Sequence, residues 1–192
     1  MKFVESYHGQ DFFELRIAGL TRRLPLLQVS DDTWIAYYYS LGDTEVIERA
    51  ARELSPELQT CQVLVTTESK GIPLTHAIAT HLNLIPYVVC RKSVRPFMLD
   101  PLTVEYKPIT AKAKEHLYMD GRDADKVRGK RVAIVDDIVS TGETMQAMEE
   151  LVQQAGGTVA KKAVMLLEGV SYPDVLHLGV LPIFRRNAHR RG

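Results

Sequence analysis

The 192-residue sequence contains little cysteine or tryptophan, no net charge and no long apolar run. Its two cysteines, Cys61 and Cys90, are too few for a disulfide framework or a four-cysteine zinc site. Both lie at the edges of apolar runs, so we expect buried thiols rather than nucleophiles. The 24 basic and 24 acidic residues cancel, which argues against a dedicated nucleic-acid-binding protein.

No apolar run approaches the roughly 20 residues that a membrane-spanning helix requires. The N-terminal sequence MKFVESYHGQDFFELR contains acidic residues where a signal peptide needs an uninterrupted apolar segment. The basic sequence RRNAHRRG at the C-terminus is typical of a solvated tail. We therefore expect a cytoplasmic protein that binds neither membranes nor nucleic acid.

Short apolar runs alternate with amphipathic helical patterns along most of the chain. Runs that are apolar without alternation are typical of parallel strands covered on both faces. They occupy residues 62–67, 86–90, 131–136 and 160–168. Helical patterns occupy residues 44–54, 73–84 and 143–155, with Asp43 as an N-cap and Gly156 and Gly157 as a stop. The alternation predicts a single α/β domain over residues 1–192, with a central, mostly parallel sheet flanked by helices.

Two regions depart from this alternation. Residues 12–40 resemble irregular strands rather than strand–helix units. Residues 93–125 contain three prolines and mixed polarity. A connection of that length inside a compact domain is typical of a functional lid or flap.

The sequence VAIVDDIVSTGETM contains the most informative motif, because two adjacent acids, Asp136 and Asp137, end an apolar run. The loop that follows opens a helix, whose free N–H groups and dipole favour an anion. Its residues are Ser140, Thr141, Gly142, Glu143 and Thr144. Carboxylates accept hydrogen bonds from sugar hydroxyls or bind a hydrated divalent cation. Acids beside an anion-binding loop therefore suit a ribose 5-phosphate group.

Three alternatives compete with this interpretation. A P-loop ATPase also has an apolar run that ends in acids, but the sequence contains no G-x-x-x-x-G-K-[ST] motif. Receiver domains carry an acid pair after their first strand, whereas this pair lies two-thirds along the chain. A solvated strand end leaves the Ser-Thr-Gly loop unexplained.

The same stretch closely resembles the phosphoribosyl pyrophosphate (PRPP) signature of type I phosphoribosyltransferases. That signature has four apolar residues, two acids, two apolar residues and a small-Thr-Gly-x-Thr loop. Glu143 departs from it, since many members have glycine there, and its side chain is expected to narrow the loop or to bring a negative charge near the phosphate. The resemblance implies a small N-terminal hood over about residues 1–40, an α/β core over 41–185 and a mobile flap near 93–125.

Further segments match the family in order along the chain. TTESKGIPLTHAIA resembles the loop that holds pyrophosphate, which implies roles for Glu68, Ser69, Lys70 and Gly71. VVCRKSVRPF resembles a segment of adenine phosphoribosyltransferases and implies that Arg91, Lys92 and Arg95 face pyrophosphate. TVEYK resembles the mobile loop of the same enzymes, with Glu105 as the acid/base group and Tyr106 as a closing or packing residue.

The resemblance implies transfer of ribose 5-phosphate from PRPP to a purine base, adenine favoured, in a homodimeric salvage enzyme that uses Mg²⁺. Asp136 and Asp137 would then orient the ribose hydroxyls near that ion. The hood gives no clear base-recognition motif. Its candidates, together with one residue near the C-terminus, are Leu26, Leu27, Gln28 and Phe184, which fit ordinary hood core equally well.

Other functions remain open at this stage. If the hood, rather than the TVEYK segment, determines which base is bound, the base is hypoxanthine, xanthine or guanine. A non-catalytic PRPP-sensing regulator fits the fold, although Glu105 is retained and no DNA-binding domain is evident. A PRPP synthetase fits poorly, because the chain is short for its two domains.

Overall fold

A computed structural model describes residues 2–107 and 114–186. The central sheet has the strand order β11-β10-β9-β5-β6, β12 also pairs with β10, and all these pairings are parallel. The strands are β5 (Val63–Thr67), β6 (Tyr87–Cys90), β9 (Arg131–Val139), β10 (Thr158–Glu168), β11 (Val175–Leu176) and β12 (Gly179–Leu181). The predicted parallel sheet is confirmed. β9 is longer than expected, since it continues through both acids to Val139.

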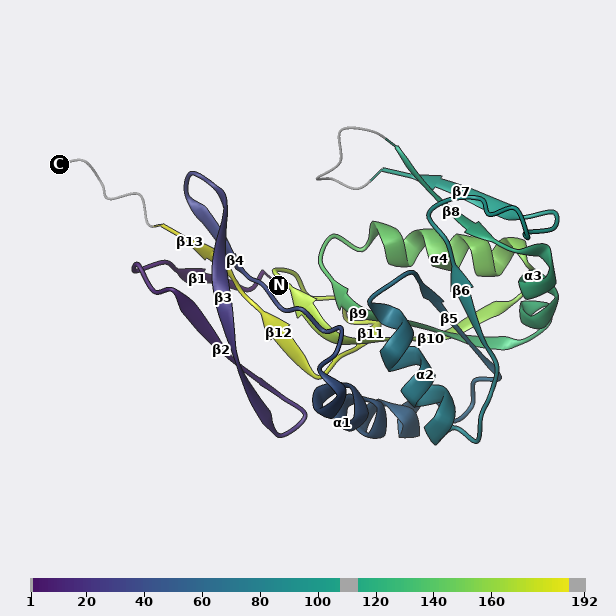
Figure 1. The fold of residues 1–192 in the computed structure, drawn as a ribbon, viewed down its shortest axis with the longest axis horizontal. Coiled ribbons are helices and arrows are strands. Elements are labelled where there is room, and N and C mark those ends of the chain that lie inside the picture. The colour runs from purple at the N-terminus through teal and green to yellow at the C-terminus, as the bar shows by residue number, and fades with distance from the viewer. Residues whose placement is uncertain (1, 108–113, 187–192) are drawn as a thin grey trace.

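Helices cover both faces of this sheet (Figure 1). α1 (Thr44–Leu54), the 3-10 helix Ser55–Leu58 and α2 (Gly71–His81) pack in one apolar cluster with Ala133 and Val135 of β9. α3 (Gly121–Val127) and α4 (Glu143–Gln154) pack in the other, with Val132 and Ile134. Alternate residues of β9 therefore belong to opposite layers, which explains the continuous apolarity of its sequence.

The helix ends follow the sequence signals. Asp43 caps α1 by accepting a hydrogen bond from the Val46 N–H at 3.4 Å. α4 ends before Gly156, whose φ of +79° is a left-handed conformation that favours glycine. Both cysteines are buried, and burial raises the pKa of each thiol, to about 12 for Cys90. The prediction that both thiols are buried is confirmed.

The hood is a second sheet with the order β1-β13-β4-β3-β2. Its strands are β1 (Val4–Ser6), β2 (Phe12–Ile17), β3 (Leu20–Ser30), β4 (Thr33–Ala36) and β13 (Ile183–Arg185). β2, β3 and β4 form an antiparallel meander, and β13 from the other end of the chain pairs parallel with β1 (Figure 1). The irregular strands expected in residues 12–40 are present as β2, β3 and β4, with a register shift between Gln28 and Ser30 in the pairing of β3 with β4.

The predicted flap contains an antiparallel hairpin of β7 (Leu102–Tyr106) and β8 (Glu115–Met119), followed by α3. The hairpin lies over α4 (Figure 1). Residues 108–113 of the flap, and residues 187–192 of the basic tail, lie outside the described residues. Within the described ranges, no helix is long and apolar enough to cross a membrane.

Candidate active site

The two adjacent acids at the end of β9 contact each other and different parts of the chain. Asp137 is 5% exposed. Its Oδ2 accepts a 2.8 Å hydrogen bond from the Ser40 hydroxyl. Asp136 Oδ1 accepts the Asp137 N–H at 2.9 Å, and the two carboxyl groups also share a side-chain hydrogen bond. The acids therefore form one interacting pair at the end of β9.

Burial and, after it, the neighbouring charge of Asp137 raise the pKa of Asp136 to about 7. The positive charge of Lys70 opposes both effects. Lys70 also opposes the rise in pKa that burial causes at Glu168, the last residue of β10, as does a hydrogen bond between Glu168 and Ser140. A single lysine thus influences carboxyl groups at the ends of two neighbouring strands.

The predicted phosphate loop lies at the N-terminus of α4 and adjoins Asp136. It lines a hollow of about 150 Å³ formed by Asp136, Ile138, Val139, Ser140, Thr141, Gly142, Thr144 and Met145. Gly142 precedes the helix with a φ of +86°, and the first N–H groups of an α-helix have no partner within it. These N–H groups, the helix dipole and two threonine hydroxyls make the hollow suitable for a phosphate.

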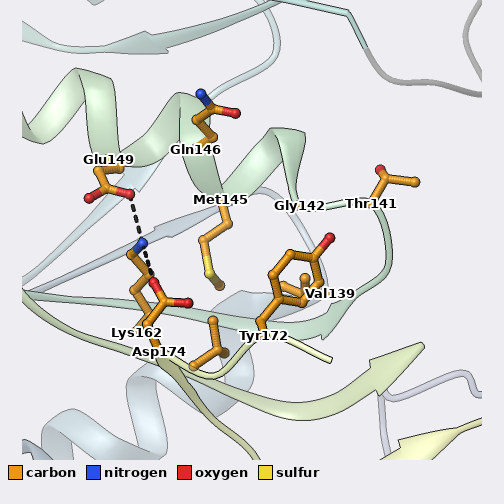
Figure 2. A pocket seen from close by; sticks show the side chains of 10 residues that line it. Val139, Thr141, Gly142, Met145, Gln146, Glu149, Lys162, Tyr172 and Asp174 are labelled. Carbon is orange, nitrogen blue, oxygen red and sulfur yellow. Dashed lines mark hydrogen bonds and ion pairs between the residues drawn. The ribbon is translucent and has the colours of Figure 1, made fainter. Parts of the chain in front are cut away.

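Tyr172 supports this loop from below. Its hydroxyl donates a 3.0 Å hydrogen bond to the Ser140 carbonyl, and a β-carbon on Gly142 would lie 2.9 Å from that hydroxyl. Beneath the loop is a second hollow of about 290 Å³, which Figure 2 shows with Tyr172 pointing toward the loop. Lys162 bridges Glu149 (2.8 Å) and Asp174 (2.9 Å) at its other end.

Glu143 is not among the residues that line the phosphate hollow. Its Oε2 atom is buried and has no hydrogen-bond partner among the described residues. The pKa of Tyr172 is raised, first by burial and then by the charge of Glu143. The Glu143 side chain therefore acts electrostatically on Tyr172.

The predicted pyrophosphate loop follows β5 and includes a cis peptide between Glu68 and Ser69. A β-carbon on Gly71 would lie 2.8 Å from Asp136 Oδ1, so this loop touches the first acid. The Glu68 carboxylate binds Arg91 (3.1 Å) and the Lys92 N–H (2.9 Å). Glu68 therefore holds the Arg91 segment beside the loop, and its charge is already compensated.

The basic candidates are not equally placed. Arg91 is half-buried beside Glu68, and Lys70 lies near Asp136. The Lys92 ammonium is 3.9 Å from Glu115, on the hairpin. Arg95 is exposed, and its backbone N–H contacts Met98 Sδ. The structure brings Lys70 and Arg91 together with the pyrophosphate loop and leaves Arg95 at the surface.

The hairpin presents Tyr106 to the site and Glu105 to solvent. Tyr106 belongs to the apolar layer of α4, and its hydroxyl donates to Glu115 at 2.9 Å. Burial and this bond raise its pKa to about 12, while a hydrogen bond with Thr144 of the phosphate loop opposes the rise. Glu105 is exposed on the opposite face, where it pairs with Lys114 and His116. The Lys114 hydrogen bond lowers its pKa, so Glu105 is ionised and is not brought to the acid pair.

The four base-binding candidates lie in the hood. Phe184 is 2% exposed, with its ring edge toward Phe13 at a centroid distance of 5.6 Å. Leu26 packs against the main core, whereas Leu27 is 44% exposed and Gln28 bonds to the Asp31 carbonyl at 3.4 Å. The burial of Phe184 thus fits the second interpretation, in which this residue belongs to the core of the hood. Leu27 and Gln28 remain accessible.

Sequence reasoning missed three residues of this site: Ser40, Glu168 and Tyr172. Glu168 carried a signal, since it ends an apolar run as the acids of β9 do. Ser40 and Tyr172 carried none, because their contacts lie 97 and 32 residues away along the chain. Such contacts depend on tertiary packing that no local pattern records.

Comparisons with known proteins agree with this geometry. A family model described as "Phosphoribosyl transferase domain" matches residues 40–178. A hypoxanthine/guanine phosphoribosyltransferase of Methanosarcina mazei is 28% identical, with 83% of each chain covered. Another, of Methanosarcina acetivorans, is 34% identical over 62% of this chain and 59% of its own length, so the chain matches little more than half of that relative.

Solved structures show the same fold. The adenine phosphoribosyltransferase of Rhodothermus marinus has a TM-score of 0.61 at 21% identity and covers 88% of this chain and 94% of its own. That of Thermoanaerobacter pseudethanolicus has a TM-score of 0.61 at 24% identity, covering 73% and 84%. The family match spans most of the chain, including the acid pair and both loops. The chain therefore belongs to the phosphoribosyl transferase domain family, with the type I phosphoribosyltransferase fold.

Proposed function

We propose that this protein is a purine phosphoribosyltransferase, which transfers ribose 5-phosphate from PRPP to a purine base and releases pyrophosphate. The observation that carries the proposal is the meeting of the phosphate hollow, the acid pair and Lys70 at the carboxyl ends of β5, β9 and β10. Ligands of open α/β sheets bind at that edge. The names of the relatives support a purine as the acceptor.

In this proposal the α4 N-terminus binds the 5-phosphate, and Asp136 and Asp137 accept hydrogen bonds from ribose hydroxyls. Lys70 and Arg91 offset the charge of the departing pyrophosphate. Nearby carboxylates also favour the positive charge that develops on the ribose as the bond to pyrophosphate breaks. The hairpin, through Tyr106, covers Thr144 and limits access of water, which would otherwise hydrolyse the activated sugar.

Mg²⁺ is the proposed cofactor, carried on the phosphates of PRPP, where it neutralises charge. The described ranges contain no group of three or more His, Cys, Asp or Glu side chains suited to holding a metal ion. Of the two acids, Asp136 lines the phosphate hollow. These residues fit a hydrated ion held mainly by the substrate rather than a cage of protein ligands.

Glu105 is proposed as the group that handles a proton on the purine ring. It lies on the outer face of the hairpin, so this role requires the hairpin to reorganise when substrates bind. In its ionised state Glu105 accepts a proton or a hydrogen bond rather than donating one.

Two candidates for the base follow from different observations. The Val104-Glu105-Tyr106 sequence resembles adenine phosphoribosyltransferases and favours adenine. Relatives of 28–34% identity named hypoxanthine/guanine phosphoribosyltransferase favour those two bases. Pyrophosphate release from PRPP and Mg²⁺, measured with adenine, hypoxanthine, guanine and xanthine in parallel, decides among them.

The same assay tests the whole proposal. We expect turnover with at least one purine and none without PRPP. If calorimetry detects PRPP binding but the assay shows no consumption of any base, the protein is a PRPP-sensing regulator instead. No binding and no turnover would reject the assignment altogether.

A further inference from the structure

The segment between β4 and α1 sends alternate side chains into the molecule. Tyr38 is 4% exposed and Ser40 is fully buried, whereas Tyr37 and Tyr39 are 42% and 58% exposed. The buried Ser40 hydroxyl donates to Asp137 Oδ2 at 2.8 Å. The Asp137 side chain also shares a hydrogen bond with the neighbouring Asp136 carboxyl, so Ser40 is its hydroxyl donor from outside the acid pair. A connecting segment of the hood thus reaches an acid of the proposed active site.

Ser40 is itself held in a fixed position. Its carbonyl accepts the Asp43 N–H at 3.2 Å, and Asp43 caps α1. Arg22 of β3 binds both Asp43 carboxylate oxygens, at 2.8 and 2.9 Å, and the Tyr38 hydroxyl donates to the same carboxylate at 3.1 Å. This two-point arginine contact is a strong, geometrically specific interaction. It connects the Ser40 backbone to a hood strand and to the first helix.

The Ser40 bond also determines which part of Asp137 is free. A carboxylate accepts hydrogen bonds on both oxygens, and the Ser40 bond occupies one direction on Oδ2. At 5% exposure, Asp137 has little water to replace a lost donor. Without the hydroxyl, the carboxylate is therefore expected to rotate toward other donors.

We propose that Ser40 is a positioning residue for the transfer reaction, and that its hydroxyl holds the Asp137 carboxylate in the orientation that receives a ribose hydroxyl. The inference rests on the proposed function of Asp137. It further makes the orientation of Asp137 dependent on the hood, through Ser40, Asp43 and Arg22. Ser40 acts through Asp137 and does not itself contact the substrate.

Three variants separate positioning from packing. Ser40→Ala removes the hydroxyl, and Ser40→Thr keeps it while adding a methyl group in a fully buried position. Ser55→Ala is the matched control, since Ser55 is 5% exposed and its hydroxyl donates to the Ala51 carbonyl at 2.6 Å, on the far end of α1. The melting temperature, kcat, and KM for PRPP and base are measured for each.

We expect Ser40→Ala to lower kcat by about tenfold to a hundredfold, the range for a misplaced catalytic group, with a smaller change in either KM. Ser55→Ala should lose a comparable amount of thermal stability and keep the wild-type kcat. Ser40→Thr should recover much of kcat even if its melting temperature falls below that of Ser40→Ala. A kcat for Ser40→Ala within twofold of wild type, or one that follows the melting temperature across the series, overturns the proposal.

Crystal structures of the wild type and Ser40→Ala give a readout that does not need turnover. The proposal expects the Asp137 carboxylate to rotate in the variant, and an unchanged carboxylate overturns it. Wild-type protein that consumes no purine rejects the proposed function, and the two structures then decide separately whether Ser40 orients Asp137.

Discussion

The α-carbon of Gly71 lies so close to Asp136 that a β-carbon there would stand 2.8 Å from Oδ1 and 3.2 Å from the Asp136 Cα. It would also collide with the Thr66 hydroxyl. Because backbone atoms cannot move aside as a flexible side chain can, only glycine allows the start of α2 to approach β9 this closely. The position of Asp136 therefore depends on the absence of a side chain at Gly71, the first residue of α2.

Gly71→Ala is expected to displace Asp136 and to lower kcat/KM for PRPP by at least about tenfold, since the pyrophosphate loop and the acid would separate. Steady-state kinetics at varied PRPP measures the effect. Gly179→Ala is the control, because its β-carbon would meet mainly the Leu166 Cδ2 methyl, at 3.1 Å, within the core. A Gly71→Ala enzyme with wild-type kcat/KM would show that the close approach has no role in binding PRPP.

Asp137→Asn is expected to lower kcat about a hundredfold, a typical loss when one preorganised electrostatic group is removed. The amide oxygen still accepts the Ser40 hydrogen bond, so the fold and the melting temperature should change little. Asp125→Asn, on α3 with a side chain 72% exposed, makes the same chemical change far from the site and should keep full activity. Equal turnover in both variants would exclude Asp137 from the reaction.

Glu105→Gln is expected to lower kcat while leaving PRPP affinity unchanged, because Glu105 faces away from the phosphate loop. Calorimetry with PRPP and Mg²⁺ gives the affinity, and the assay with excess base gives kcat. Glu115→Gln, on the paired strand, is a useful contrast because Glu115 accepts the Tyr106 hydroxyl bond. We expect it to weaken the hairpin's contact with Thr144 and so to raise KM for PRPP.

The α/β core was predictable because its signals are local. Continuous apolar runs, the Asp43 cap and the glycine stop after α4 each follow from a few neighbouring residues. The phosphate loop was predictable for the same reason, since its anion-binding groups are consecutive. The hood was less so: its strands were expected, but the parallel pairing of β1 with β13 joins residues about 180 positions apart.

The placement of the site candidates also has physical causes. Period-two alternation in β7 places Tyr106 over the phosphate loop and Glu105 on the outside, and a motif that names adjacent residues does not record which one faces inward. Phe184 is aromatic and near the C-terminus, but the hood sheet buries it against Phe13. The charge of Glu143 acts on Tyr172, a residue that the sequence did not connect with the loop.

Tyr172→Phe is expected to raise KM for PRPP several-fold and to lower unfolding free energy by about 1 kcal/mol, the usual net value of one hydrogen bond. The ring still fills the space beneath Gly142, but the Ser140 carbonyl loses its donor (Figure 2). Tyr7→Phe is the control, because Tyr7 stacks on Trp34 in the hood, with ring centroids 3.8 Å apart. An unchanged KM in Tyr172→Phe would show that the loop does not depend on this support.

The raised pKa of Asp136 predicts how stability depends on pH. The folded protein holds a proton on this carboxyl up to a pKa of about 7, whereas the ordinary pKa of an aspartate is 3.8. Between these values the folded state binds more protons than the unfolded state, so the contribution of Asp136 to stability falls as pH rises from about 4 to 7 and is constant above. The groups that set the shift are the buried surroundings, Asp137 and Lys70.

Asp136→Asn removes this titration. Urea unfolding at pH 5 and pH 8 measures the free energy of unfolding of both proteins. At pH 8 we expect this free energy to be about 1–3 kcal/mol higher for the variant than for the wild type, and at pH 5 we expect a smaller difference. The reason is that the wild-type carboxyl is charged and poorly solvated only at the higher pH. Asp125→Asn should leave the wild-type pH dependence unchanged, since that carboxylate is exposed. If the free energy of unfolding changes equally for wild type and Asp136→Asn between the two pH values, Asp136 does not hold a proton near neutral pH. Its negative charge is then available to ribose hydroxyls throughout the range.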